Sequence, residues 1–371
     1  MVPFRTVPAL LLLLLSTTTS VCNGLTKVVE TCEDLQDAFD STKQQDVEVE
    51  IDPYSEITCS SFTTMSMNSN TLTVISSEEL CDACRASVNL NEIRFEVTNG
   101  AKLFFHPSVS FVGTEEQDVN GGAVYVGEGS TARFYTNFET EDVGVRSVPE
   151  DGSDFASYEL SGGCVYVDGY FRVDGDATFV RCEVGGGGES SPGPGGVMYV
   201  GGTGSVLFAG EVSMSEVSIT DDEGNNGGGI YNKGKVNIKG NAEFKDLRAE
   251  AGGAIFNAKG AEFRFKSGAT AIFNECFAHD EIAGAVYNLG YFKFSGPALA
   301  LNSDSPAYYI GSTGYMRLSE NSVFWGGGDE DGPAVQVATG GKLTGESSAE
   351  FISGSETGCA TVYYEDGDVC L

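Results

Sequence analysis

One five-residue phrase recurs along the chain, and its last residue is aromatic in most copies. The six clearest copies begin at Gly121, Gly162, Gly195, Gly227, Gly252 and Ala283, and the first of them reads Gly-Gly-Ala-Val-Tyr. Weaker copies are Ser305-Pro-Ala-Tyr-Tyr309, Gly332-Pro-Ala-Val-Gln336 and Gly358-Cys-Ala-Thr-Val362. The aromatic residues at the fifth position are Tyr125, Tyr166, Tyr199, Tyr231, Phe256, Tyr287 and Tyr309. Flat rings in a row suit stacking against sugar rings, so their orientation decides their chemistry.

The fourth position of the phrase indicates which way those rings point. It is aliphatic in seven of the nine copies, namely Val124, Val165, Met198, Ile230, Ile255, Val286 and Val335. Such uniformity is typical of an inward-facing stack, and alternation along a strand then turns the fifth residue outward. We therefore expect an outward aromatic stripe that binds glycan. The alternatives are an interior aromatic stack, or a stripe covered by the loops at 139–161 and 184–194.

Polar and acidic residues offer further candidate sites. Asn232, Asn257 and Asn288 each follow the aromatic residue, and they form either ligands or a ladder of amides that satisfies the turn backbone. Acidic clusters stand at Glu139/Glu141/Asp142, Asp221/Asp222/Glu223 and Asp329/Glu330/Asp331. The last two lie beside glycines and could hold Ca²⁺, although none of the clusters has EF-hand spacing. The competing interpretation is solvated acidic loops.

Catalytic residues are not identified by the sequence. Only His106 and His279 are present, far apart. A polysaccharide lyase needs Arg or Lys beside carboxylates that hold Ca²⁺, and a glycoside hydrolase needs paired carboxylates. Asp221 and Asp222 are adjacent, so on a strand they would point to opposite faces. Basic residues are scarce, and Arg264 alternates with two phenylalanines as an outward strand residue would.

The spacing of short strands and glycines predicts the fold that positions these residues. In 230–244, pieces with period-two alternation are separated by Gly234 and Gly240. Three short strands in a unit of about twenty-five residues leave no room for helices between them. We therefore expect an all-β chain that forms a single right-handed parallel β-helix, a solenoid in which each strand stacks on its equivalent one coil away. The nine copies of the phrase would make a rod on the order of 40 Å long.

The N-terminal segment predicts export and a cap. Residues 1–24 resemble a signal peptide, with Arg5 before the apolar run Ala9 to Leu15 and cleavage after Cys22 or Gly24. Thr31-x-x-Asp34 is a helix start, so we assign 25–45 to a capping helix and 46–371 to the solenoid. No later segment is long or apolar enough to span a membrane. The mature protein is thus expected to be secreted, at the cell wall or surface.

Cysteines and charge agree with an extracellular location. The sequence holds ten cysteines, and loss of Cys22 would leave nine, with one unpaired. Candidate disulfide residues are Cys32 with Cys59, Cys81 with Cys84, and Cys359 with Cys370. The chain carries 54 acidic and 21 basic residues, for a net charge of −33. Such a field repels nucleic acid, anionic membranes and polyanionic sugars, and it tolerates neutral partners.

The phrase beginning at Gly252-Gly-Ala-Ile255, together with Phe134-Tyr-Thr-Asn137, resembles the repeats of chlamydial polymorphic outer-membrane proteins. More broadly, the chain looks like the pectin-lyase-like β-helix superfamily over roughly 100–371. That resemblance implies the fold, whereas the superfamily includes lyases, hydrolases, epimerases and adhesins alike.

The function expected from all these features is an extracellular interaction rod. It would bind glycan or protein partners without catalysis. The alternative is a carbohydrate-active enzyme of the same fold, either a polysaccharide lyase, a hydrolase or an epimerase. A third possibility is an acidic structural protein that takes up Ca²⁺.

Overall fold

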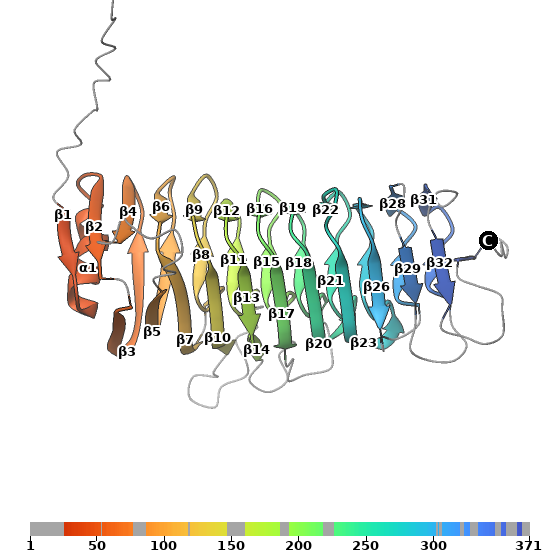
Figure 1. The fold of residues 1–371 in the computed structure, drawn as a ribbon, viewed down its shortest axis with the longest axis horizontal. Helices are drawn as coiled ribbons and strands as arrows, with labels where there is room; N and C mark the ends of the chain where they lie inside the picture. Colours follow the sequence, from red (N-terminus) through yellow and green to blue (C-terminus); the bar gives the residue numbers. More distant parts are fainter. Residues whose placement is uncertain are drawn as a thin grey trace, which may run out of the picture.

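The structure is a computed structural model that describes residues 26–52, 54–76, 87–117, 119–146, 160–185, 193–217, 226–301, 303, 306–319, 323–326, 333–345, 350–353 and 362–365. Over these residues the chain is a parallel β-helix whose strands lie side by side along a rod (Figure 1). The predicted all-β solenoid is therefore confirmed. Each coil contributes strands to three faces, which we call faces A, B and C.

Face A is a twelve-stranded parallel sheet. Its strands are β1 (Thr26–Val29), β2 (Val47–Ile51), β4 (Thr71–Ser76), β6 (Lys102–Phe105), β9 (Thr131–Phe134), β12 (Tyr170–Val173), β16 (Ser205–Phe208), β19 (Lys235–Ile238), β22 (Glu262–Phe265), β25 (Tyr291–Phe294), β28 (Tyr315–Leu318) and β31 (Lys342–Thr344). At a strand separation of about 4.8 Å, twelve strands span roughly 50 Å. The rod is longer than the copies of the phrase predict, because the first coils lack the phrase.

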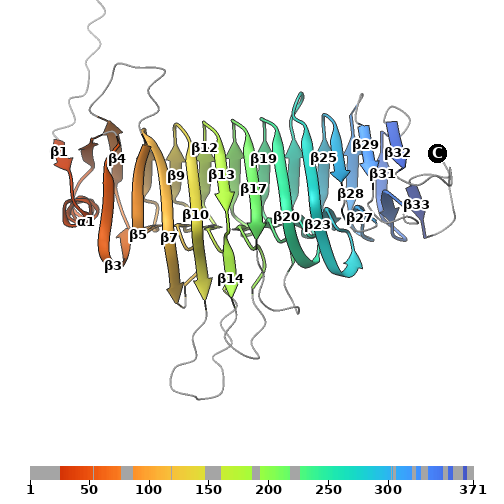
Figure 2. The same cartoon turned by 60° about the horizontal axis from the view of Figure 1, so that its bottom comes forward.

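Face B follows face A in each coil and contains the longest strands (Figure 2). Its strands are β3 (Glu56–Met67), β5 (Ser87–Val97), β7 (Ser108–Gln117), β10 (Phe138–Arg146), β13 (Ala177–Val180), β14 (Glu183–Gly185), β17 (Val212–Val217), β20 (Ala242–Ala251), β23 (Ala271–Ile282), β26 (Ala298–Leu301), β29 (Val323–Gly326) and β32 (Glu350–Ser353). The strand β5 continues round the corner and pairs with β7 on face B and β8 on face C.

Face C is built from the phrase found in the sequence. Its strands are β8 (Val124–Val126), β11 (Val165–Val167), β15 (Met198–Val200), β18 (Ile230–Asn232), β21 (Ile255–Asn257), β24 (Val286–Asn288), β27 (Tyr308–Ile310), β30 (Val335–Val337) and β33 (Val362–Tyr364). The first residue of the phrase has positive φ, as at Gly162 (φ 68°), where an added Cβ would lie 2.3 Å from the Val165 carbonyl oxygen. Glycine is favoured there because it has no Cβ to clash, although Ala283 has positive φ at the same position of a later copy.

The interior is a continuous apolar core that follows from period-two alternation. The inward residues of the phrase, such as Val165 and Ile230, are fully buried. Phenylalanines on successive strands of face A stack inside the rod, with ring centroids 4.9 Å apart for Phe263 and Phe292. Burying such side chains removes large apolar areas from water, which is the main stabilising contribution in a rod without a globular core.

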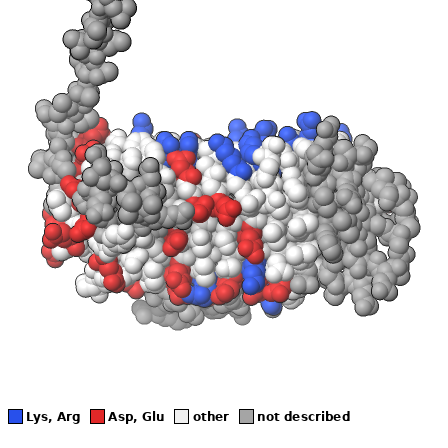
Figure 3. Space-filling view, in the orientation of Figure 1, with Lys and Arg blue, Asp and Glu red and all other residues white. Residues whose placement is uncertain are grey.

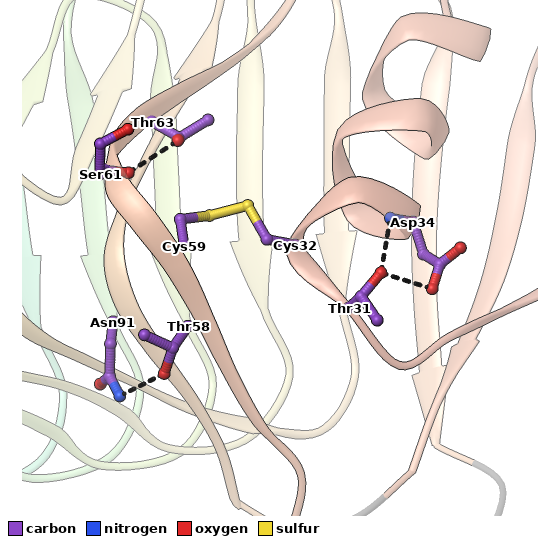
Figure 4. The surroundings of a disulfide bond; sticks show 8 residues. All are labelled: Thr31, Cys32, Asp34, Thr58, Cys59, Ser61, Thr63 and Asn91. Carbon is purple, nitrogen blue, oxygen red and sulfur yellow. Dashed lines mark hydrogen bonds between the residues drawn. A yellow bond between two sulfur atoms is a disulfide. The ribbon is translucent and has the colours of Figure 1, made fainter.

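The N-terminal cap is the helix α1 (Cys32–Ser41), as the sequence predicts. The Thr31 side chain accepts a hydrogen bond from the Asp34 backbone N–H, and Leu35, Ala38 and Phe39 are buried. Cys32 is joined to Cys59 on β3, which confirms that predicted disulfide (Figure 4). One boundary differs, because β1 lies within the residues assigned to the cap and already pairs with β2.

Candidate functional site

The seven predicted aromatic residues form one column on the outside of face C, which we call the aromatic ladder (Tyr125, Tyr166, Tyr199, Tyr231, Phe256, Tyr287 and Tyr309). Each residue pairs with the next in exact strand register, as Tyr166 does with Tyr199. Their side chains are partly exposed, apart from Phe256 at 8%, while the residues on either side of them in each strand are buried. The outward orientation expected from alternation is therefore present.

The rings of the aromatic ladder stack on one another. Successive ring centroids lie 4.8–5.6 Å apart, and the interplanar angles are between 5° and 23°. Each ring between the two end rings is thus covered on both faces by its neighbours, and its edge points away from the rod. A ligand on face C would meet ring edges and tyrosine hydroxyls, not ring faces.

The aromatic ladder ends where the equivalent strand position of the adjacent coil holds a residue that is not aromatic. Before Tyr125 the equivalent residue is Glu96, and after Tyr309 it is Gln336. The next residue in register is Tyr363, which is 41% exposed. Our sequence alignment of the last phrase was wrong by one residue, because Val362 occupies the buried fourth position and not the fifth.

Four hydroxyls of the aromatic ladder have a raised pKa and stay protonated. Burial raises the pKa of Tyr125, Tyr166, Tyr287 and Tyr309, and the Asp168 carboxylate raises the pKa of the first two further. A tyrosine with a raised pKa remains a hydrogen-bond donor through neutral and alkaline pH. These hydroxyls can therefore donate to oxygen atoms of a ligand.

Two basic side chains border the aromatic ladder. The ammonium group of Lys233 lies 5.4 Å from the ring centroid of Tyr199 and 5.3 Å from that of Tyr231. The guanidinium of Arg94 lies 5.6 Å from the ring centroid of Tyr125. These distances are within the range of cation–π attraction.

The three asparagines form the predicted amide ladder beneath the turns between faces C and A. Asn232 Nδ2 donates to Asn257 Oδ1, and Asn257 Nδ2 donates to Asn288 Oδ1, each at 2.8 Å. The backbone N–H groups of Gly234 and Gly290 donate to Asn232 and Asn288 at 3.0 and 3.1 Å. All three amides are fully buried, so their hydrogen bonds serve the fold.

The acidic clusters divide between described and undescribed parts of the chain. Glu141 and Asp142 both bind the guanidinium of Arg181, which also contacts Glu216 at 3.4 Å. The candidate calcium residues Asp221, Asp222 and Glu223, and Asp329, Glu330 and Asp331, lie outside the described residues. Among the residues that the structure does describe, no three His, Cys, Asp or Glu side chains are grouped to hold a metal.

The two histidines are not brought together. His106 follows β6 on face A, where its ring stacks on Tyr135 at 4.1 Å, whereas His279 lies on β23 of face B. Burial, followed by the charge of Arg133, lowers the pKa of His106. A neutral imidazole stacked on a tyrosine has a packing role here.

A second disulfide was missed by the sequence analysis. Cys164, in the third position of the phrase, is bonded to Cys182, and both are fully buried. Other clear copies have Ala, Val or Gly at that position, so the substitution by cysteine was the available signal. Cys276 is a free, buried thiol, and Cys81, Cys84, Cys359 and Cys370 lie outside the described residues.

Comparison of the chain with family models, with curated proteins and with solved structures finds no match. Its similarity to chlamydial repeats and to the pectin-lyase-like superfamily therefore stays an expectation from the residues. Over the described ranges, the chain has no helix of the length and apolarity needed to cross a membrane.

Proposed function

We propose that the protein is a secreted, non-catalytic rod that binds a neutral linear glycan along the aromatic ladder of face C. The observation that carries this proposal is the in-register column of rings, one per coil over seven coils, of which all but Phe256 are partly exposed. A site that repeats along one axis suits a partner that also repeats along one axis, because each added unit makes the same contact again.

The chemistry of face C favours an uncharged partner. Its nine strands contain no Asp, Glu, Lys or Arg. Tyrosine hydroxyls at regular intervals can donate to the hydroxyl and ring oxygens of sugars, while ring edges cover the apolar C–H groups. The rigid stack also limits the side-chain entropy that binding would cost.

Two features support export of the protein and an extracellular role for this surface. The two disulfides fit an oxidising compartment, and the N-terminal residues resemble a signal peptide. The resemblance to chlamydial repeats points in the same direction, toward adhesion.

The enzyme alternative requires a basic group beside carboxylates, and Arg181 has such neighbours. Hydrogen bonds from Arg181 to Asp142 and Glu141 raise the pKa of the guanidinium, so it stays protonated. A protonated guanidinium whose N–H groups already bind three carboxylates is unsuited to act as a general base. The cluster neutralises charge along one corner of the rod, and we favour binding over catalysis.

Affinity electrophoresis through gels that contain neutral polysaccharides tests this proposal. The decisive variant is Tyr166→Phe/Tyr199→Phe/Tyr231→Phe, which removes three hydroxyls but keeps the stack, as Phe256 already does. We expect retardation of the wild type, and binding weaker by about tenfold or more in the variant, because three hydrogen bonds are lost.

The matched control is Tyr170→Phe/Tyr291→Phe, which removes hydroxyls on face A only. It should be retarded like the wild type. Free migration of the folded wild type in every neutral gel, or equal retardation of the wild type and the triple variant, would contradict the proposal.

A further inference from the structure

Basic residues are concentrated on face A of the rod. From β6 to β31, the strands of face A carry eight basic residues against the single acid Glu262, although acids outnumber bases in the whole chain by 54 to 21. The eight are Lys102, Arg133, Arg172, Lys235, Arg264, Lys293, Arg317 and Lys342. Figure 3 shows Lys and Arg gathered along the upper edge, where Figure 1 places the strands of face A. We call this surface the basic face.

The cations of the basic face form columns because the strands are in register. Arg133 pairs with Arg172 on the next coil. Further along the same column, Arg264 pairs with Lys293 and Lys293 with Arg317. A cation on each of three successive coils gives one positive charge about every 4.8 Å along the rod.

Several of these charges have no ion-pair partner among the residues that the structure describes. Arg133 and Arg172 share the carboxylate of Asp174, and Arg264 pairs with Glu262. By contrast, Lys235, Lys293, Arg317 and Lys342 form no ion pair with any residue that the structure describes. These four side chains are therefore available to bind an anionic ligand.

Aromatic side chains stand between the cations, in a different arrangement from the aromatic ladder. Tyr170 lies between Thr131 and Ser205 in the register, so no ring stacks on it from an adjacent strand. Tyr291 and Tyr315 are adjacent but meet edge to face, at 63°. Neighbouring rings therefore do not cover one another as they do in the aromatic ladder, and the Arg264 guanidinium lies 5.3 Å from the ring centroid of Tyr291.

We propose that the basic face binds a linear polysaccharide with an anionic group on its sugars. One sugar ring is about as long as the separation of neighbouring strands, about 4.8 Å, so successive anionic groups can meet successive cations. The basic face is only two outward residues wide on each strand. This width fits a single extended chain better than a wide duplex or a membrane.

The basic face differs in charge from the molecule as a whole. A net charge of −33 predicts repulsion of polyanions from the molecule as a whole. At physiological ionic strength, however, charges act over a Debye length of about 8 Å, so a ligand on the basic face responds mainly to local cations. The sequence hides this face because its cations are separated by a whole coil and by loops of unequal length.

Binding is tested by affinity electrophoresis with two anionic probes, dextran sulfate and polygalacturonate, and with neutral dextran as the uncharged control. The variant is Lys293→Gln/Arg317→Gln, and the matched control Lys245→Gln/Arg248→Gln removes the same charge from β20 on face B. We expect the wild type and the control to bind an anionic probe at 50 mM NaCl, and the variant to bind at least about tenfold more weakly. Retention should fall as NaCl is raised to 200 mM.

Other outcomes separate the possible partners. Binding of dextran sulfate alone would assign sulfate esters, and binding of polygalacturonate alone would assign carboxylates. Equal loss in both double variants, no retention by either anionic probe, or stronger binding of a single-stranded oligonucleotide would overturn the inference. Sedimentation velocity tests whether the basic face binds a second copy of the chain instead. Salt-sensitive self-association that Lys293→Gln/Arg317→Gln abolishes and Lys245→Gln/Arg248→Gln does not would also overturn the inference. The face C variant Tyr166→Phe/Tyr199→Phe/Tyr231→Phe should bind the anionic probe normally, which separates this inference from the proposed function.

Discussion

Replacing the central asparagine of the amide ladder should destabilise the rod more than replacing all three. Asn257→Val removes the hydrogen bonds that Asn257 makes with Asn232, Asn288 and the Tyr291 carbonyl. The Asn232 Nδ2 group then loses one acceptor and the Asn288 Oδ1 atom loses one donor, and both atoms stay buried. Because an unsatisfied buried group costs about 1–3 kcal/mol, partly offset by the remaining bonds, we expect a loss of about 2–4 kcal/mol.

The triple variant Asn232→Val/Asn257→Val/Asn288→Val should be milder. Val200 precedes the ladder in register and Ile310 follows it, so the variant extends an aliphatic column. Asn288 Nδ2 already lacks a partner, since Ile310 cannot accept a hydrogen bond. Removing all partners together leaves no orphaned amide, and we expect a loss of about 1 kcal/mol.

The turn at Val167 indicates how the backbone adapts to a valine. There the Gly169 N–H donates to the Val126 carbonyl of the previous coil at 3.0 Å. In the triple variant, the Gly234 N–H can use the Val200 carbonyl in the same way. The freed glycine N–H groups therefore need not remain unsatisfied.

Urea unfolding followed by far-UV circular dichroism measures these differences, provided that the m value is unchanged. The control Asn237→Val alters an outward asparagine of β19 and should shift stability by less than about 0.5 kcal/mol. If the triple variant lost as much as the sum of the three single variants, unsatisfied partners would not be the source of the cost.

Three further predictions concern single positions. Gly252→Ala, at φ +64°, should destabilise the rod by about 2 kcal/mol or more. Ala283→Gly, at φ +62°, should stabilise it by about 0.5–1 kcal/mol in the same urea assay. Similar effects of the two substitutions would contradict the idea that a side chain is strained at this position. Burial raises the pKa of the Cys276 thiol, so wild type should show one more reactive thiol than Cys276→Ser in denaturant and no difference when folded. The pKa of His106 is lowered in the folded state, so folding resists protonation of this imidazole. The stability that the neutral ring contributes above pH 6.5 should therefore be lost as the pH falls through the folded pKa. The variant His106→Gln should lose less stability than the wild type between about pH 7 and 5, and equal losses would count against this role.

The sequence predicts face C well because one repeated phrase specifies its register. The column of aliphatic residues, the outward rings and the amide ladder all follow from aligning that phrase. The exception is the last copy, where Gly358-Cys resembled a start of the phrase and displaced Tyr363 by one position. Alternation around Val362, which is buried, is the better guide at that end.

Faces A and B were harder to predict because no motif marks their strands. Matching Lys293 with Arg317 requires the length of every intervening turn, which the phrase does not give. The Cys164–Cys182 bond likewise joins the residue before β11 to the residue before β14, and its 18-residue separation includes a whole strand of face A. The stacking of the rings against one another also lies beyond a pattern of residue types, because it depends on side-chain orientation.

The spacing of the aromatic ladder gives the protein an optical property. Tyrosines whose centroids lie about 5 Å apart, as Tyr125, Tyr166, Tyr199 and Tyr231 do, exchange excitation energy much faster than they emit light. Transfer depolarises emission only when the rings are tilted relative to one another, and neighbouring planes here differ by no more than 14°. Emission from the intact stack should therefore keep its polarisation, and disordering of the rings should lower it. Phe256, which absorbs at shorter wavelength, lies in the same column between Tyr231 and Tyr287. Tyrosine anisotropy can thus report the order of the stack without any added label.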